Sequence, residues 1–208
     1  MIVTKVIEYD KKKVLVQIDE HFTFPLYKTE LHKYHITEKH EISEKVYKEI
    51  LGELLPKRVK LRAMKLLEKR PYTRETLRRK LLEGKYPDCL IDDAIDYVTG
   101  FHYIDDVKYA EDYIHCFASK RSRKQITQEL MRKGVSKADI DLAWSSLEDS
   151  YETLDETAQI MAILRKKKFD ISSTDYKEKC KMFQYLYRKG YDMNCIQKCM
   201  QFEEDYGN

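Results

Sequence analysis

The chain has 208 residues, of which 42% are hydrophobic and 36% charged, and its formal net charge is +3, a composition that permits an ordered core. It lacks an apolar run of about 18 residues and the charged-then-apolar pattern of a secretory signal, so we expect a cytoplasmic protein with no membrane partner. The five scattered cysteines, mostly at apolar positions of helical segments, predict buried thiols in a reducing compartment, and only six glycines leave little material for phosphate-binding loops.

Short β-branched and aromatic runs distinguish the first 42 residues from the rest. Val3–Ile7, Val14–Ile18 and Phe22–Phe24 are typical of short strands. They predict a small antiparallel hairpin, with material for a third strand, that ends near Pro25. Strands this short bury little apolar surface alone, so we expect the segment to pack on the helical body or on a partner.

Amphipathic helices are predicted throughout the chain from Ser43 onward. Apolar residues recur there at spacings of three and four, among many Lys, Glu, Leu and Arg residues. A first helix is predicted from Ser43 to Leu54. Pro56 interrupts it and fits the first turn of the next helix, which is expected to extend to Lys69.

Three copies of one helical pattern then follow, spaced by 49 and 56 residues. Four apolar positions coincide in a gapless alignment: Leu77, Leu81, Ile91 and Ile95; Ile126, Leu130, Ile140 and Trp144; Met182, Leu186, Ile196 and Met200. A helix end and a new helix start correspond at Lys85-Tyr86-Pro87, Gly134-Val135-Ser136 and Gly190-Tyr191-Asp192. Thr73 and Ser122 occupy matching N-cap positions. We interpret each copy as a three-helix module.

These patterns predict a mainly α-helical protein, an elongated, curved array of three tandem three-helix modules with a small N-terminal β-hairpin-like segment. The predicted domains are 1–42 for the β-rich segment, 43–107 for the first helix and repeat 1, 108–157 for repeat 2 and 158–208 for repeat 3. A module of about 50 residues buries little core alone, so neighbouring modules are expected to stack.

Positive charge is concentrated between Lys57 and Lys85, where twelve Lys or Arg face three Glu for a local net of +9, against −6 for the remainder. Arg70 through Arg74 and Arg78 through Lys80 have few acidic partners along the helices, which favours a binding surface over a solvated face. Nearby aromatic rings, Tyr72, Tyr86 and Tyr103, are placed to stack on bases, although most tyrosines and Trp144 are expected to serve packing.

Neither an enzyme nor a cofactor or metal site is predicted. The sequence contains no GxSxG, P-loop, HExxH or Gly-rich dinucleotide motif. His32 and His35, like Cys195 and Cys199, have ligand-like spacing, but no second pair follows either of them. We interpret them as surface histidines and buried thiols.

Residues 57–200 resemble the RecX family, the regulators of the bacterial recombinase RecA. Three stretches carry the resemblance: Arg62–Thr73 leading into Leu77–Leu81; Tyr103–Asp106 followed by Tyr109-Ala110 and Tyr113-Ile114; and Ile126–Val135, echoed by Leu186–Tyr191. Thr73 stands where Ser is common and Ser122 where Gly is expected. The N-terminal strands are only loosely similar to the family, so the resemblance says little about them.

The resemblance implies a monomer that binds the RecA filament on single-stranded DNA and modulates, chiefly inhibits, its recombinase, ATPase and co-protease activities in DNA repair and the SOS response. DNA itself would be contacted weakly or indirectly. Two alternatives stay open: a direct DNA-binding protein that acts through basic helices without RecA, and a scaffold for another acidic protein. The basic surface that contacts the partner or DNA is expected to comprise Arg58, Arg62, Lys65, Arg70, Arg74, Arg78, Arg79, Lys80, Arg121, Arg123, Lys124, Arg132 and Lys133.

Overall fold

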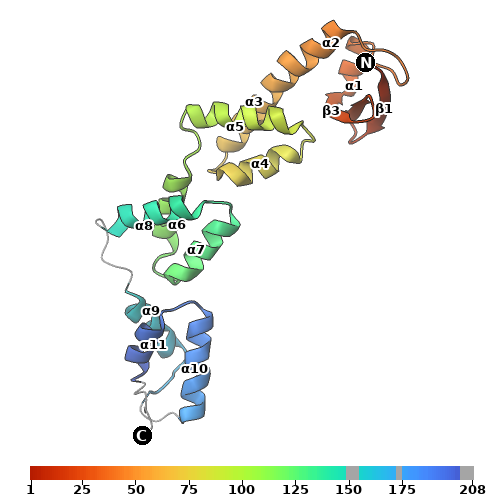
Figure 1. Cartoon of the computed structure of the whole chain (residues 1–208). Coiled ribbons are helices and arrows are strands. Elements are labelled where there is room, and N and C mark those ends of the chain that lie inside the picture. Colours follow the sequence, from red (N-terminus) through yellow and green to blue (C-terminus); the bar gives the residue numbers. More distant parts are fainter. Residues whose placement is uncertain (149–154, 172–174, 202–208) are drawn as a thin grey trace. The chain divides into compact units, whose positions relative to one another are not determined.

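The computed structural model describes residues 1–148, 155–171 and 175–201 (Figure 1). The chain divides into two compact units, Met1–Asp105 and Asp106–Asn208. The protein is mainly helical with a small N-terminal sheet, as predicted, and three groups of three helices follow one another along the chain (Figure 1). Within the described ranges, no helix is long and apolar enough to cross a membrane.

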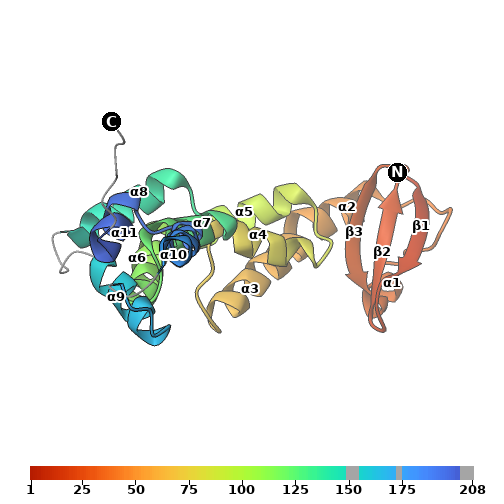
Figure 2. The ribbon, with the colours of Figure 1, turned by 90° about the horizontal axis from the view of Figure 1, so that it is seen from below.

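The first unit begins with an antiparallel sheet of order β1-β2-β3, whose strands are β1 (Val3–Glu8), β2 (Lys13–Ile18) and β3 (Phe22–Tyr27) (Figure 2). Alternate residues of β2 are buried, because side chains point to opposite faces of a sheet along a strand. The third strand runs through Pro25 instead of ending there. A proline is tolerated because β3 is an edge strand and needs no N–H on its free side.

The helices of the first unit are α1 (Lys28–Lys33), α2 (Glu44–Glu49), α3 (Leu55–Leu67), α4 (Arg74–Leu82) and α5 (Asp88–Gly100). Pro56 lies in the first turn of α3, as predicted. The predicted break between the helix ending at Leu54 and the next helix is wrong. A π-helical segment, Ile50–Leu54, joins α2 to α3, and the backbone keeps helical angles throughout.

One hydrophobic core connects the sheet to the first module. Val16 and Phe24 of the sheet belong to the same buried cluster as Val59 of α3, Leu77 of α4 and Ile95 of α5. The prediction that the short strands pack on the helical body is confirmed. The sheet is therefore held beside α3, which positions the site described below.

The second unit contains α6 (Asp106–Phe117), α7 (Arg123–Arg132) and α8 (Lys137–Glu148), then α9 (Glu156–Lys166), α10 (Tyr176–Arg188) and α11 (Met193–Met200). The aligned apolar positions of the three copies are all buried except Met182, which is partly buried. Trp144 is 3% exposed and packs in the core, as expected. The predicted repeat thus has a physical basis in three equivalent cores.

The second and third modules have separate hydrophobic cores, one around Ile126 and Leu130 and another around Leu186 and Ile196. The expectation that modules of this size must stack to complete a core is therefore wrong for this pair. Each module closes a small core among its own three helices. The contacts between the second and third modules described next are polar.

Polar contacts join the second module to the third. The Ser122 hydroxyl, which caps α7, donates to the carbonyl of Lys189 at 2.8 Å. One carboxylate, Glu156, accepts hydrogen bonds from the backbone N–H groups of Arg123 and Asp192 at 3.2 and 3.1 Å. These donors lie at the starts of α7 and α11, where a negative charge is favourable.

Gly190→Ala should lower the free energy of unfolding by about 1–2 kcal/mol, because Gly190 has φ +82° and L-residues are strained there. The added Cβ would also lie 2.9 Å from Oγ of Ser122. Gly52→Ala, where a Cβ meets nothing within 4 Å, is the control and should be neutral or slightly stabilising. Urea unfolding followed by circular dichroism checks both, and equal midpoints for the two variants would contradict the expectation.

Candidate functional site

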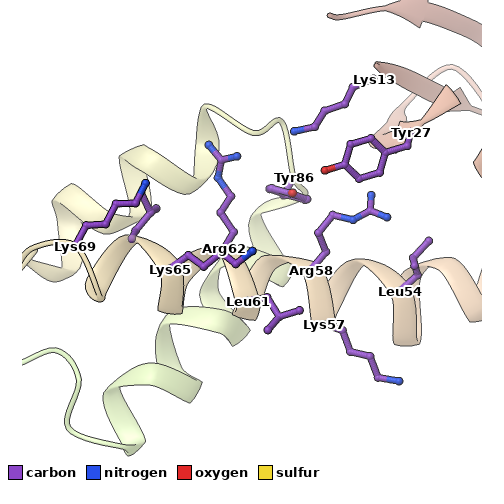
Figure 3. Close-up of a pocket in the computed structure, with 11 residues that line it drawn as sticks. Lys13, Tyr27, Leu54, Lys57, Arg58, Leu61, Arg62, Lys65, Lys69 and Tyr86 are labelled. Atoms are coloured by element: carbon purple, nitrogen blue, oxygen red, sulfur yellow. The ribbon is translucent and has the colours of Figure 1, made fainter. Parts of the chain in front are cut away.

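A basic groove of about 560 Å³ opens in the first unit between the sheet, α3 and the loop before α5 (Figure 3). Its lining combines six cations with two tyrosines and three leucines. The lining residues are Lys13, Tyr27, Leu54, Lys57, Arg58, Leu61, Arg62, Lys65, Leu66, Lys69 and Tyr86. We refer to this feature as the basic groove.

Helix α3 supplies most of the lining because its residues separate into faces. Val59 and Ala63, four residues apart, are fully buried against the core. Arg58, Arg62 and Lys65 recur at the same three- and four-residue spacing and line the groove beside that buried face. A single amphipathic helix therefore anchors the core and presents a row of cations.

Arg58 belongs to the wall of the groove. Its guanidinium forms an ion pair with Glu30, and the side chains of both residues are less than one-fifth exposed. The same guanidinium lies 4.7 Å from the ring centre of Tyr27. Since Glu30 already neutralises it, Arg58 holds α3 to the sheet segment and contributes little free charge.

The other groove cations supplied by α3 and by the turn after it, Lys57, Arg62, Lys65 and Lys69, have no carboxylate within 4 Å in the described part of the chain. The Nε atom of Arg62 is buried and has no hydrogen-bond partner there. A buried donor without a partner is costly to the fold, and this atom is too buried to contact an incoming anion. The feature of the groove that bears on binding is therefore the positive charge of these four side chains.

Tyr86 forms a neutral, aromatic part of the groove. Figure 3 shows its ring with Arg62 on one side and Arg58 and Tyr27 on the other. Burial raises the pKa of the Tyr86 phenol, although the two arginines oppose the shift. The phenol therefore stays protonated at neutral pH and adds no negative charge to the groove.

Unlike the groove cations, the predicted cations of α4 form ion pairs with carboxylates. Arg78 binds Asp88 at 2.8 Å and Asp92 at 3.1 Å, and these hydrogen bonds raise the pKa of its guanidinium. Arg74 binds Asp96 at 2.5 Å. The expectation of few acidic partners is wrong here, because the partners come from α5, the helix packed beside α4.

Two further predicted cations of α4 form ion pairs with glutamates three or four residues away in the sequence. Arg79 lies 3.5 Å from Glu75, and Lys80 lies 2.7 Å from Glu83. Arg70, before α4, is exposed and places its guanidinium 4.6 Å from the ring centre of Tyr72. Of the predicted first-module set, Arg62 and Lys65 are therefore the residues that join the groove without a carboxylate partner.

The predicted cations of the second module belong to the second unit, and most contact aromatic or acidic neighbours. Arg121 forms an ion pair with Glu129 and donates to the Tyr113 hydroxyl at 3.0 Å. Arg132 lies 4.0 Å from Glu129. The Lys133 ammonium lies 5.4 Å from the ring centre of Tyr113.

Arg123 and Lys124, at the start of α7, also lie over rings. Arg123 is 4.7 Å from the ring centre of Trp144, and Lys124 is 5.7 Å from that of Tyr187 in the third module. These contacts combine packing with positive charge at an exposed surface. Their part in partner binding stays a prediction.

Sequence reasoning missed part of the groove. Lys57 and Lys69 share its face at helical spacing from Leu61 and Lys65, so the periodicity of α3 was a usable signal. Lys13 and Tyr27 come from the sheet, and only the tertiary fold brings them to α3.

Comparison with known proteins identifies the modules. Sequence models of the first, second and third three-helix domains of RecX match residues 60–97, 105–143 and 155–200. A regulatory protein RecX of Clostridium perfringens is 33% identical over 185 residues, covering 88% of this chain and 86% of the relative. One from Caldanaerobacter subterraneus is 28% identical over 202 residues, covering 96% and 98%.

Solved structures show the same fold. A crystal structure of a regulatory protein RecX superposes with a TM-score of 0.63 at 20% identity, over 97% of this chain and 98% of the other. RecX from Lactobacillus salivarius gives a TM-score of 0.61 at 21% identity, over 71% and 95%.

We expect Arg62→Gln with Lys65→Gln to elute from heparin at a clearly lower salt concentration than the wild type, because both cations are uncompensated in the groove. Arg79→Gln with Lys80→Gln removes the same charges from ion-paired positions and is the matched control. It should shift elution less. Equal shifts for the two double variants would show that the groove is not a preferred polyanion site.

Proposed function

This chain belongs to the RecX family of regulatory proteins, and from that premise we propose that it binds the RecA filament on single-stranded DNA and inhibits its recombinase, ATPase and co-protease activities. The basic groove is the proposed contact surface. The protein acts in the cytoplasm as a monomer and needs no cofactor. The observation that carries the role of the groove is that Lys57, Arg62, Lys65 and Lys69 have no carboxylate within 4 Å among the described residues.

The chemistry of the groove suits a polyanionic partner. A RecA filament contains a continuous strand of phosphates, and positive charge that is not neutralised internally attracts such a partner over about 8 Å at physiological salt. Binding of this kind needs no chemical step. Occupation of the filament surface would oppose RecA by steric and electrostatic means, in keeping with relatives that are named regulatory proteins.

A second candidate function is direct DNA binding without RecA. The groove cations that have no carboxylate partner among the described residues favour it, because they suit phosphates from any source. The two functions differ in what RecA adds. Direct binding alone would give the same affinity for single-stranded DNA with and without the recombinase, and would follow a steep salt dependence.

We expect the wild-type protein to inhibit RecA ATPase on single-stranded DNA, and Lys65→Glu with Lys69→Glu to weaken inhibition at least tenfold in the concentration needed, because several charge contacts are reversed. Lys177→Glu with Lys181→Glu, two exposed lysines of α10, carries the same charge change and is the control. It should inhibit nearly as well as the wild type.

Two results would contradict the proposal. No inhibition by the wild type would remove the RecA role, and full potency of the groove variant would remove the groove from it. Circular dichroism of both variants confirms that they fold.

A further inference from the structure

Three aromatic rings form an exposed cluster at the end of α5 in the first unit. Phe101 is 57% exposed, Tyr103 56% and Tyr97 38%. The ring centres of Tyr97 and Phe101 lie 4.9 Å apart, and those of Phe101 and Tyr103 lie 6.0 Å apart with only 19° between the ring planes. Exposed rings gathered in this way forgo burial that would stabilise the fold, which points to a binding surface. We call this cluster the aromatic ladder.

The backbone around the helix end produces the ladder. Tyr97 and Phe101 are four residues apart and so share one face of the helix. His102 then adopts a left-handed conformation at φ +57°, and the N–H of Tyr103 donates to the carbonyl of Val98 at 3.0 Å. This closure turns the chain back and brings Tyr103 beside Phe101, while Ile104 is buried and anchors the loop. Backbone hydrogen bonding thus places the two residues side by side, and their ring planes lie 19° apart.

The basic groove and the aromatic ladder meet across α3. The Lys60 ammonium lies 4.7 Å from the ring centre of Tyr97. At about 100° per residue, Lys57 lies roughly 60° from Lys60 around the helix and 40° from Leu61, between the ladder side and the groove side. Lys57 and Leu61 both line the groove. Cations therefore continue from the groove over α3 to the ladder.

Charge around the ladder favours bases over phosphates at the rings themselves. Asp93 is exposed one helical turn before Tyr97, and Asp96 is held by Arg74. A phosphate close to Asp93 would be repelled, whereas a neutral base would not. A single strand fits this division, because its phosphates can follow the lysines while its bases turn toward the rings.

We propose that Phe101 and Tyr103 form a stacking platform for the bases of single-stranded DNA whose backbone follows Lys60, Lys57 and the basic groove. Every base presents a flat face, so stacking on rings flanked by cations binds single strands without sequence preference. Duplex DNA, with its bases stacked inside, is excluded from the platform. The contact is made by this chain alone and does not depend on the proposed action on RecA.

Fluorescence anisotropy with two labelled ligands, oligo(dT) and an abasic deoxyribose-phosphate strand of equal length, tests the platform in the absence of RecA. Phe101→Leu with Tyr103→Leu keeps apolar side chains but removes both ring faces. It should weaken oligo(dT) binding roughly tenfold or more and leave binding of the abasic strand unchanged. Arg62→Gln with Lys65→Gln should weaken binding of both ligands.

Tyr176→Leu, at a 71% exposed tyrosine of the second unit, is the control and should bind both ligands as the wild type does. Unchanged oligo(dT) affinity in the ladder variant would overturn the platform, and is the result expected if the rings dock another protein. Equal losses for both ligands would also overturn it, since stacking cannot act on a strand without bases. Because no RecA is present, either result leaves the ATPase test of the proposed function independent.

Discussion

The pairing of α4 cations with α5 carboxylates determines which charges of the first unit are available to a partner. Arg78 is shared by Asp88 and Asp92, and Arg74 is bound by Asp96. Exposed ion pairs of this kind contribute at most about 1 kcal/mol each to stability, so their main effect is to neutralise the positive charge of the two arginines. The +9 stretch is thereby divided into a compensated helix, α4, and a helix, α3, whose cations other than Arg58 have no carboxylate partner among the described residues. The proposed role of the basic groove depends on that division.

Much of the fold could be predicted from the sequence. A helix that buries one face needs apolar residues every three or four positions. Three copies of the module show this spacing, at Leu77, Ile126 and their equivalents. The junctions between helices could also be predicted from the sequence, because Gly134 and Gly190 end helices with φ angles of +83° and +82°. The full length of the third strand was harder to predict from the sequence. A proline inside a strand is acceptable only at the edge of a sheet, and which strand lies at the edge depends on the tertiary fold.

The site was only partly predictable. Counting acidic neighbours along one helix found few partners for the basic residues of α4. In the structure α5 supplies partners for Arg74 and Arg78, and nearby glutamates pair with Arg79 and Lys80. The basic groove also needs Lys13 and Tyr27, which no local pattern connects to Arg62. Charge density along the sequence thus located the region of the basic groove but not the set of residues that lines it. Packing between helices, and between sheet and helix, decides which cations are paired with carboxylates and which line the groove.

Lysine acetylation followed by mass spectrometry, on the free chain and on the chain bound to RecA filaments, tests the central claim most directly. The account predicts that Lys65 and Lys69 lose reactivity in the bound state, while Lys80, paired with Glu83, and Lys177 on α10 keep theirs. Equal reactivity of Lys65 and Lys69 in the free and bound states would contradict the claim that the basic groove is the contact surface.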